Sequence, residues 1–167
     1  MKTNICVYGL TEDYVKKIAK RVSNKFEMFF ADVDALIEFD LINTQMVEEV
    51  CGKEYLEKLE RKKVKNTATF ENTLLSLKFS LINDEMNRKV LDENCLMVYI
   101  KLNEESFEKK LSKSSKEKLN RILSMAVFKE RDKLLESYAD IVVDCSDLNV
   151  YSATVKVQDK IFDYYEV

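Results

Sequence analysis

Two aspartates one residue apart follow an apolar stretch near the N-terminus, and their spacing makes them the first candidates for chemistry. Asp32 and Asp34 lie where FFA gives way to the helix-like run ALIEFDLI. At such a junction a carboxylate can ligate a hard cation such as Mg²⁺, or accept a hydrogen bond from a hydroxyl group and help to activate it. The ordinary alternative is that each aspartate caps the following helix. Both interpretations stay open from these residues alone.

The residue types that are missing restrict the chemistry further. The chain has no histidine, which is the usual general base, metal ligand and pH-sensitive group. Catalysis would therefore depend on carboxylates, Lys, Arg, Tyr, Cys or a bound metal. The four cysteines lie far apart without a C-x-x-C pair, which is typical of reduced thiols rather than of a zinc site. Only two glycines are present, so the backbone has little of the freedom that phosphate loops need.

The overall composition predicts one soluble domain. The chain has 167 residues, of which 46% are hydrophobic and 34% charged. A net charge of −3 gives no electrostatic reason to expect nucleic acid as a partner. No apolar run approaches the ~20 residues that cross a bilayer, and the N-terminus has too short an apolar core for a secretory signal. We therefore expect a cytoplasmic protein with neither a membrane nor a nucleic-acid partner.

Short apolar runs alternate with amphipathic helical patterns along the chain. The runs that we expect to form strands span residues 3–8, 26–30, 73–81, 95–102 and 139–143. This alternation predicts an α/β three-layer sandwich, with a five-stranded parallel sheet covered by helices on both faces, in a single domain over residues 1–167. A segment rich in lysine and serine near 110–120 is expected to be an exposed, mobile, lid-like insertion.

Two groups of aromatic residues have different expected roles. Phe26, Met28, Phe29 and Phe30 fall within the second predicted strand and should belong to the core. The aromatic residues of the last predicted helix either pack that helix on the core or form a surface for a partner, and they are Phe162, Tyr164 and Tyr165.

Three stretches taken together resemble a known family. They are FADVDALIE at 30–38, GKEYLEKLE at 52–60 and ERDKLLESYADIVVD at 130–144. Their order and spacing are similar to those of the shikimate kinases, which are small P-loop kinases that phosphorylate a hydroxyl group of shikimate with ATP and Mg²⁺ during aromatic amino acid biosynthesis. The resemblance covers nearly the whole chain and implies the P-loop kinase fold.

The resemblance also implies roles for individual residues. Asp32 matches the carboxylate associated with magnesium. Asp34 matches the carboxylate that binds substrate hydroxyl groups and serves catalysis, and Arg131 matches an arginine that binds the substrate carboxylate. From its own properties, Arg131 is equally an ion-pair partner for a nearby acid such as Asp34.

The family's phosphate loop, G-x-x-x-x-G-K-[ST], has no match between the first strand and the first helix. The interval from Gly9 to Asp13 is about three residues shorter and lacks the Lys-Ser or Lys-Thr pair. Thr11 is a plausible helix cap there, and Glu12 and Asp13 follow it. At ~5 Å and an effective dielectric constant of about 20, one such acid repels a phosphate charge by about 3 kcal/mol. We therefore expect no cofactor-binding residues at this turn.

Other departures concern the substrate and the lid. The family's triple glycine would lie near Leu77, Lys78 and Phe79, whose bulk should close a gap that the substrate uses. A second substrate arginine is replaced by Glu57, which repels a carboxylate. The segment 111–119 contains lysines but no arginine.

Three hypotheses follow from these features. The first is a shikimate-kinase-like pseudoenzyme without ATP or Mg²⁺, retained as a binding or interaction module. The second is an active kinase that uses ATP and Mg²⁺ on shikimate or a similar hydroxy acid, with Asp34, Asp32 and Arg131 in the roles above. The third is a subunit of a larger assembly, with a protein partner or a second copy bound through residues 110–118 or the C-terminal aromatics. A small hydroxy-acid ligand is compatible with the first two.

Overall fold

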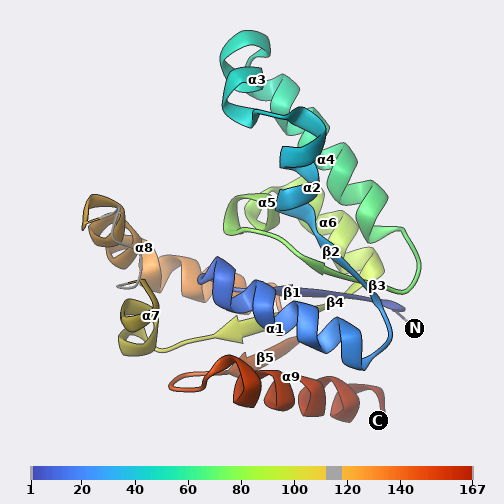
Figure 1. The fold of residues 1–167 in the computed structure, drawn as a ribbon, viewed down its shortest axis with the longest axis vertical. Coiled ribbons are helices and arrows are strands. Elements are labelled where there is room, and N and C mark those ends of the chain that lie inside the picture. The colour runs from blue at the N-terminus through green and yellow to red at the C-terminus, as the bar shows by residue number, and fades with distance from the viewer. Residues whose placement is uncertain (1, 112–117, 167) are drawn as a thin grey trace.

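Five parallel strands form one sheet in the computed structural model, which describes residues 2–111 and 118–166, the side chains of 118–121 excepted (Figure 1). The strand order is β2-β3-β1-β4-β5. The strands are β1 (Asn4–Tyr8), β2 (Phe29–Asp32), β3 (Thr73–Ser76), β4 (Cys95–Lys101) and β5 (Ile141–Asp144). The predicted fold class is therefore confirmed.

Helices cover both faces of this sheet, because alternate strand residues point to opposite sides. Ile5 and Val7 of β1 face a core shared with α1 and α9, whereas Cys6 and Tyr8 face a core shared with the helices of the other layer. All five residues of β1 are buried, as a central strand covered on both faces requires. The helices are α1 (Glu12–Lys25), α2 (Val33–Leu41), α3 (Thr44–Cys51), α4 (Lys53–Ala68), α5 (Phe79–Asn83), α6 (Glu85–Asn94), α7 (Glu104–Leu111), α8 (Lys118–Ser137) and α9 (Val150–Tyr165).

The second predicted strand was placed too early. The chain leaves α1 through a turn in which Glu27 has a φ of 53°, so β2 begins only at Phe29. Because β2 is an edge strand, Phe29 is 63% exposed and lies against the exposed ring of Phe70, and the prediction that it belongs to the core is wrong. Phe26, Met28 and Phe30 are partly buried and pack against the core.

The third predicted strand was placed too long. Residues 73–81 were expected to be extended, but β3 ends at Ser76 and α5 begins at Phe79. Leu77, Leu81 and Ile82 are all buried in one core cluster. In a helix, neighbouring residues lie about 100° apart around the axis, so Leu81 and Ile82 can both reach one core, whereas a strand would send them to opposite faces.

The helix pair α2–α3 and the first turn of α4 extend away from the sheet (Figure 1). No residue of α3 is buried. Asn43 caps α3 by accepting a hydrogen bond from the backbone N–H of Met46, and Gly52, with a φ of 89°, ends it. We call residues 36–51 the arm.

The C-terminal helix α9 packs beside α1. The ring of Phe162 meets that of Phe26 edge-on at 5.0 Å, and the Tyr165 hydroxyl donates to the carbonyl of Lys2 at 2.9 Å. Phe162 and Tyr164 remain about half exposed. Within the described residues, no helix has the length and apolar character needed to cross a membrane. The predicted lid-like segment falls for the most part on residues 112–117, outside the described chain.

Candidate functional site

The turn between β1 and α1 is short and tightly packed. Tyr8 ends the strand and Glu12 begins the helix, so three residues connect them. A Cβ atom on Gly9 would lie 2.8 Å from Cγ2 of Val15 and 2.9 Å from the carbonyl oxygen of Ile100 in β4. Glycine is therefore needed here for close backbone approach. Thr11 occupies the N-cap position as predicted, but its side chain makes no capping hydrogen bond.

Side chains of this chain connect α1 to the segment after β5. The Tyr14 hydroxyl donates to the carbonyl of Leu148 at 2.8 Å, and burial raises the pKa of Tyr14. The Lys110 ammonium lies 3.7 Å from the centre of the Tyr14 ring. In open α/β sheets, ligands bind outside the carboxyl ends of the strands. Tyr14 follows β1 and Leu148 follows β5, so their hydrogen bond lies beyond the carboxyl ends of these strands.

Asp32 caps α2 and forms an ion pair. Its Oδ1 accepts a hydrogen bond from the backbone N–H of Ala35 at 3.1 Å, and its Oδ2 lies 3.3 Å from Nζ of Lys16 in α1. The capping contribution of such a residue is typically about 1 kcal/mol. Both carboxylate oxygens therefore have partners within the chain.

The side chain of Asp34 is more buried than that of Asp32, and only one of its two carboxylate oxygens accepts a hydrogen bond. Its side chain is 12% exposed, and its Oδ2 accepts a hydrogen bond from the backbone N–H of Lys78 at 2.9 Å. Oδ1 is shielded from solvent and has no hydrogen-bond partner among the described atoms, because Nζ of Lys78 stays 3.9 Å away. Burial raises the pKa of Asp34. Lys78 and Lys16 oppose this shift, and Glu12 adds to it.

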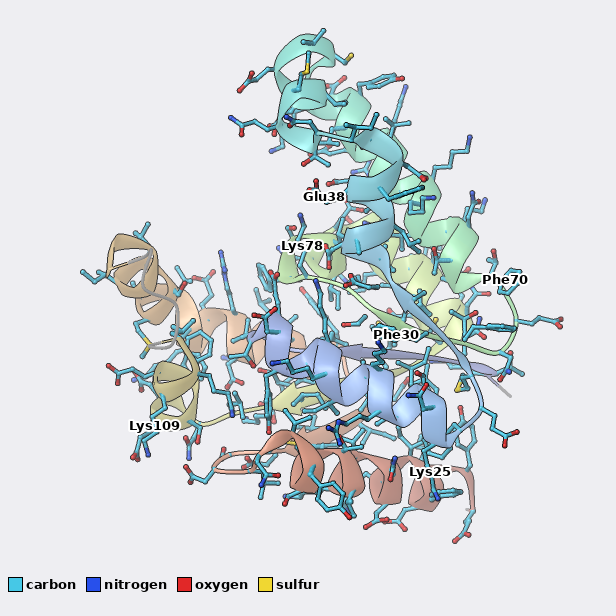
Figure 2. The ribbon with its side chains drawn as sticks, in the orientation of Figure 1. Lys25, Phe30, Glu38, Phe70, Lys78 and Lys109 are labelled. Atoms are coloured by element: carbon cyan, nitrogen blue, oxygen red, sulfur yellow. The ribbon has the colours of Figure 1, made fainter. Side chains whose placement is uncertain are left out.

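Lys78 is a residue that sequence reasoning missed at this site. It was expected only to fill space after the third strand, yet its backbone and its ammonium group both face Asp34, and Figure 2 shows it at the base of the arm. Asp32 and Ser76 are register partners in the adjacent strands β2 and β3. Residues that directly follow two adjacent parallel strands lie close together. The local sequence does not show which strands are adjacent, so it could not predict this contact.

Arg131 lies near this group without pairing to it. Its side chain is exposed on α8, and the guanidinium carbon lies 4.5 Å from the centre of the Phe79 ring, a cation–π distance. Among the described residues the cation that pairs with Asp34 is Lys78, so the alternative of an Asp34–Arg131 ion pair is wrong. Phe79 follows Lys78 directly, and the structure therefore brings Asp34 and Arg131 to one neighbourhood. The ligand roles of Asp32, Asp34 and Arg131 stay predictions.

Two cavities border α4. One of about 300 Å³ contains Glu57, the residue at the predicted substrate-arginine position, which lies 3.8 Å from both Lys53 and Arg61. Arg61 also forms a bidentate pair with Asp84, the shortest contact being 2.7 Å. Burial raises the pKa of the neighbouring Glu60, and Lys78 opposes that shift.

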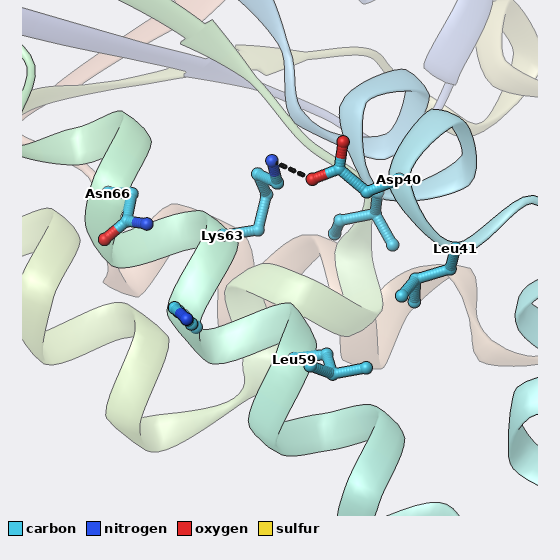
Figure 3. Close-up of a pocket in the computed structure, with 7 residues that line it drawn as sticks. Asp40, Leu41, Leu59, Lys63 and Asn66 are labelled. Carbon is cyan, nitrogen blue, oxygen red and sulfur yellow. Dashed lines mark ion pairs between the residues drawn. The ribbon is translucent and has the colours of Figure 1, made fainter.

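The other cavity measures about 250 Å³ and lies between α2 and α4 (Figure 3). Its apolar lining comes from Ile37, Leu41 and Leu59, and an ion pair joins Lys63 to Asp40 at its edge. Asp34 does not line this cavity, and its hydrogen bond runs to Lys78 in the connection between β3 and α5.

Comparison with known proteins relates this geometry to a family. The family model described as shikimate kinase matches residues 16–162 and so begins beyond the β1–α1 turn. The shikimate kinase of Dictyoglomus turgidum is 25% identical, with 98% of this chain and 99% of the relative covered. The shikimate kinase of Xylella fastidiosa is 24% identical, with 92% and 89% covered.

Solved structures show the same fold. A shikimate kinase from Acinetobacter baumannii in complex with shikimate has a TM-score of 0.82 at 16% identity, over 98% of this chain and 95% of the other. A shikimate kinase from Aquifex aeolicus has a TM-score of 0.78 at 21% identity, over 97% and 98%. At these identities the structural similarity is evidence of fold.

Proposed function

Because the chain belongs to the shikimate kinase family, we propose that it keeps the family's fold without phosphoryl transfer and acts as a binding or interaction module. The β1–α1 turn carries this proposal. Three residues replace the longer glycine-rich loop, and Gly9 is pressed against the Ile100 carbonyl. Phosphate loops depend on several backbone N–H groups that converge on the anion. A turn this short, packed on β4, has no room for that arrangement.

The charges around the turn support the same proposal. Glu12 and Asp13 occupy the first turn of α1, the end of a helix that otherwise attracts anions. Phosphoryl transfer depends on neutralising phosphate charge and on positioning. Two carboxylates at this position oppose the first requirement.

The donor set at Asp32 does not fit a resident Mg²⁺ ion. Magnesium in kinases takes one or two carboxylates together with phosphate oxygens and water. Here the backbone N–H of Ala35 and the Lys16 ammonium engage the two oxygens of Asp32. We propose that Lys16 supplies the positive charge beside Asp32 that a metal supplies in working kinases.

A second candidate function is an active kinase acting on shikimate or a similar hydroxy acid. One observation favours it: Asp34 Oδ1 is buried without a hydrogen-bond partner, as an acceptor awaiting a substrate hydroxyl group would be. The same atom also fits the first proposal, in which a hydroxy acid binds without being phosphorylated. For turnover, ATP and Mg²⁺ would require the β1–α1 turn to open.

Thermal unfolding with millimolar Mg–ATP tests the proposal directly. Ligand at a hundredfold excess over its dissociation constant stabilises the folded state by about 2.7 kcal/mol. We expect no saturable rise in melting temperature with Mg–ATP, whereas the Dictyoglomus turgidum relative serves as a comparison under the same conditions. A saturable shift in this protein would contradict the proposal.

A coupled assay of ADP release with shikimate separates the two candidate functions. We expect no release above that of an Asp34→Asn variant, which keeps the size of the side chain and removes its charge. Release that depends on both shikimate and Asp34 would establish the active kinase instead.

A further inference from the structure

The arm carries a group of exposed apolar side chains that nothing in the described chain covers. Phe39 is 83% exposed, Ile42 89%, Met46 61% and Val50 73%. Single exposed apolar residues are ordinary, but a cluster on one protruding element marks an interaction surface. We call these four residues the arm patch.

The four residues of the arm patch lie on α2, on the α2–α3 connection and on α3. Ile42 joins α2 to α3 with a φ of 61°, a conformation that a β-branched residue rarely adopts. Met46 and Val50 lie four residues apart in α3, on one side of a helix without buried residues. Side chains at helical spacing suit a partner that is itself a helix laid along the arm.

The charged side chains of the arm itself are all acidic, and the nearest cations belong to α4, where Lys53 and Arg61 line one cavity with Glu48. Residues 26–52 contain no lysine or arginine. Within the arm, Glu38, Glu48 and Glu49 are exposed, whereas Asp40 is paired with Lys63 of α4. A partner that covers the patch must therefore place cations against these three glutamates.

The acidic rim selects among possible occupants. Two copies joined through this patch would bring their glutamates together, and like charges at an interface are unfavourable. Anionic membrane surfaces and nucleic acids carry the same sign as the rim. A basic helix with an apolar side meets both the charge and the apolar surface, and methionine adapts well to such partners.

We propose that the arm patch binds a basic amphipathic helix of another protein. The inference deepens the proposed interaction role and rests on it for that role alone, because the arm lies apart from the β1–α1 turn (Figure 1). Lysine or arginine residues of the partner face Glu38, Glu48 and Glu49, and its apolar side covers Phe39, Ile42, Met46 and Val50.

The exposed thiol of Cys51 provides the measurement, since the other three cysteines are buried. An environment-sensitive dye attached to Cys51 reports titration with a synthetic amphipathic helix of leucine and lysine. We expect saturable binding, weakened about tenfold or more in Phe39→Lys/Val50→Lys. The matched variant Ile122→Lys/Leu123→Lys changes net charge equally at exposed apolar positions of α8 and should bind as the parent does.

Several results would overturn the inference. One is that a peptide with the same composition in a non-amphipathic order, or a leucine–glutamate helix, binds as tightly as the leucine–lysine helix. Another is that both double variants weaken binding of the leucine–lysine helix to the same extent. Binding to phosphatidylserine vesicles through the patch, or a dimer in sedimentation that only Phe39→Lys/Val50→Lys dissolves, would assign the patch to another occupant. Calorimetry of unlabelled protein guards against an effect of the dye.

The two proposals fail separately. A saturable Mg–ATP shift together with patch-dependent peptide binding would contradict the pseudoenzyme proposal and support the binding surface. The absence of both a Mg–ATP shift and patch-dependent binding would contradict the binding surface and leave the pseudoenzyme proposal in place.

Discussion

Several residues near the carboxyl ends of the strands make specific contacts within the chain. Lys16 lies beside Asp32 and Lys78 lies beside Asp34, so each of these carboxylates has a cation within the chain. Gly9 fits where any side chain would meet the carbonyl of Ile100. These contacts involve neighbours from α1, β4 and the segment after β3, and they join elements that are far apart in the sequence.

Gly9→Ala tests the tight turn. The added methyl group would lie 2.8 Å from Val15 and 2.9 Å from a backbone oxygen, and such overpacking typically costs about 1–3 kcal/mol. We expect a loss of that size in the free energy of unfolding by urea. Gly52→Ala is the comparison, because its cost comes from a φ of 89° with open space around it. A Gly9→Ala variant as stable as the parent would mean that the turn moves freely from Ile100.

Asp34→Asn tests the buried carboxylate through pH. Since burial raises the pKa of Asp34 in the folded state, the folded protein binds a proton more readily than the unfolded chain does. Protonated Asp34 therefore favours folding at low pH, and this advantage is lost as pH rises through the raised pKa. We expect Asp34→Asn to be more stable than the parent at neutral pH, with a difference that shrinks toward the pKa of an unperturbed aspartate. Melting temperatures measured across this range check the trend, and a constant difference would contradict it.

Helix caps and ion pairs stabilise the helices, and they join residues that are separated by different distances in the sequence. Asp32, Asn43 and Asp84 cap α2, α3 and α6 through hydrogen bonds within three residues. The pair between Arg61 and Asp84 then fixes α4 against α6, across 23 residues of sequence. Capping is thus local, whereas the orientation of the helices depends on pairs between elements.

Asp84→Ala tests two contributions of one residue, the N-cap of α6 and the ion pair with Arg61. Loss of the cap alone should cost about 0.5–2 kcal/mol, and loss of the Arg61 pair adds to it. Asp84→Asn keeps a capping oxygen and removes the charge, so its loss should be smaller. The hydrogen bond from Arg61 lowers the pKa of Asp84, so the stabilisation is present above the usual pKa of aspartate and fades as pH falls through the lowered value. Unfolding by urea at neutral and acidic pH measures each effect, and equal losses for the two variants would contradict the capping role.

The whole molecule divides into a tightly packed sheet and a loosely attached arm. The strands β1, β3 and β4 lie between two buried cores, whereas α3 contributes no buried residue. Opening the arm therefore exposes little apolar surface, and opening the sheet exposes most of it.

Hydrogen exchange should follow this division. We expect the amides of α3 to exchange far earlier than those of β1 and β4, which should exchange only when the whole domain unfolds. Mass spectrometry of exchanged peptides checks the order. Protection of α3 equal to that of the sheet would mean that the arm is covered in solution, and addition of the leucine–lysine helix should slow exchange in the arm alone.

Much of the architecture could be predicted because it depends on local patterns. Apolar runs between amphipathic stretches marked five strands, and their alternation with helices implies a parallel sheet with two covered faces. The errors fall where position in the sheet overrides the pattern. Phe29 is apolar yet exposed on an edge strand, and residues 79–83 are apolar yet helical because their burial follows a helical turn.

By itself, the sequence determined the fold class, the absence of histidine and the acids at the start of α1, since each depends on residue type and near neighbours. Only the tertiary structure decided that Lys78 faces Asp34, that Gly9 meets Ile100, that Arg131 lies on Phe79, and that the arm patch stays uncovered. These contacts join residues tens of positions apart. They follow from strand order and register, which a parallel sheet sets through packing of the entire domain rather than through any single stretch of the chain.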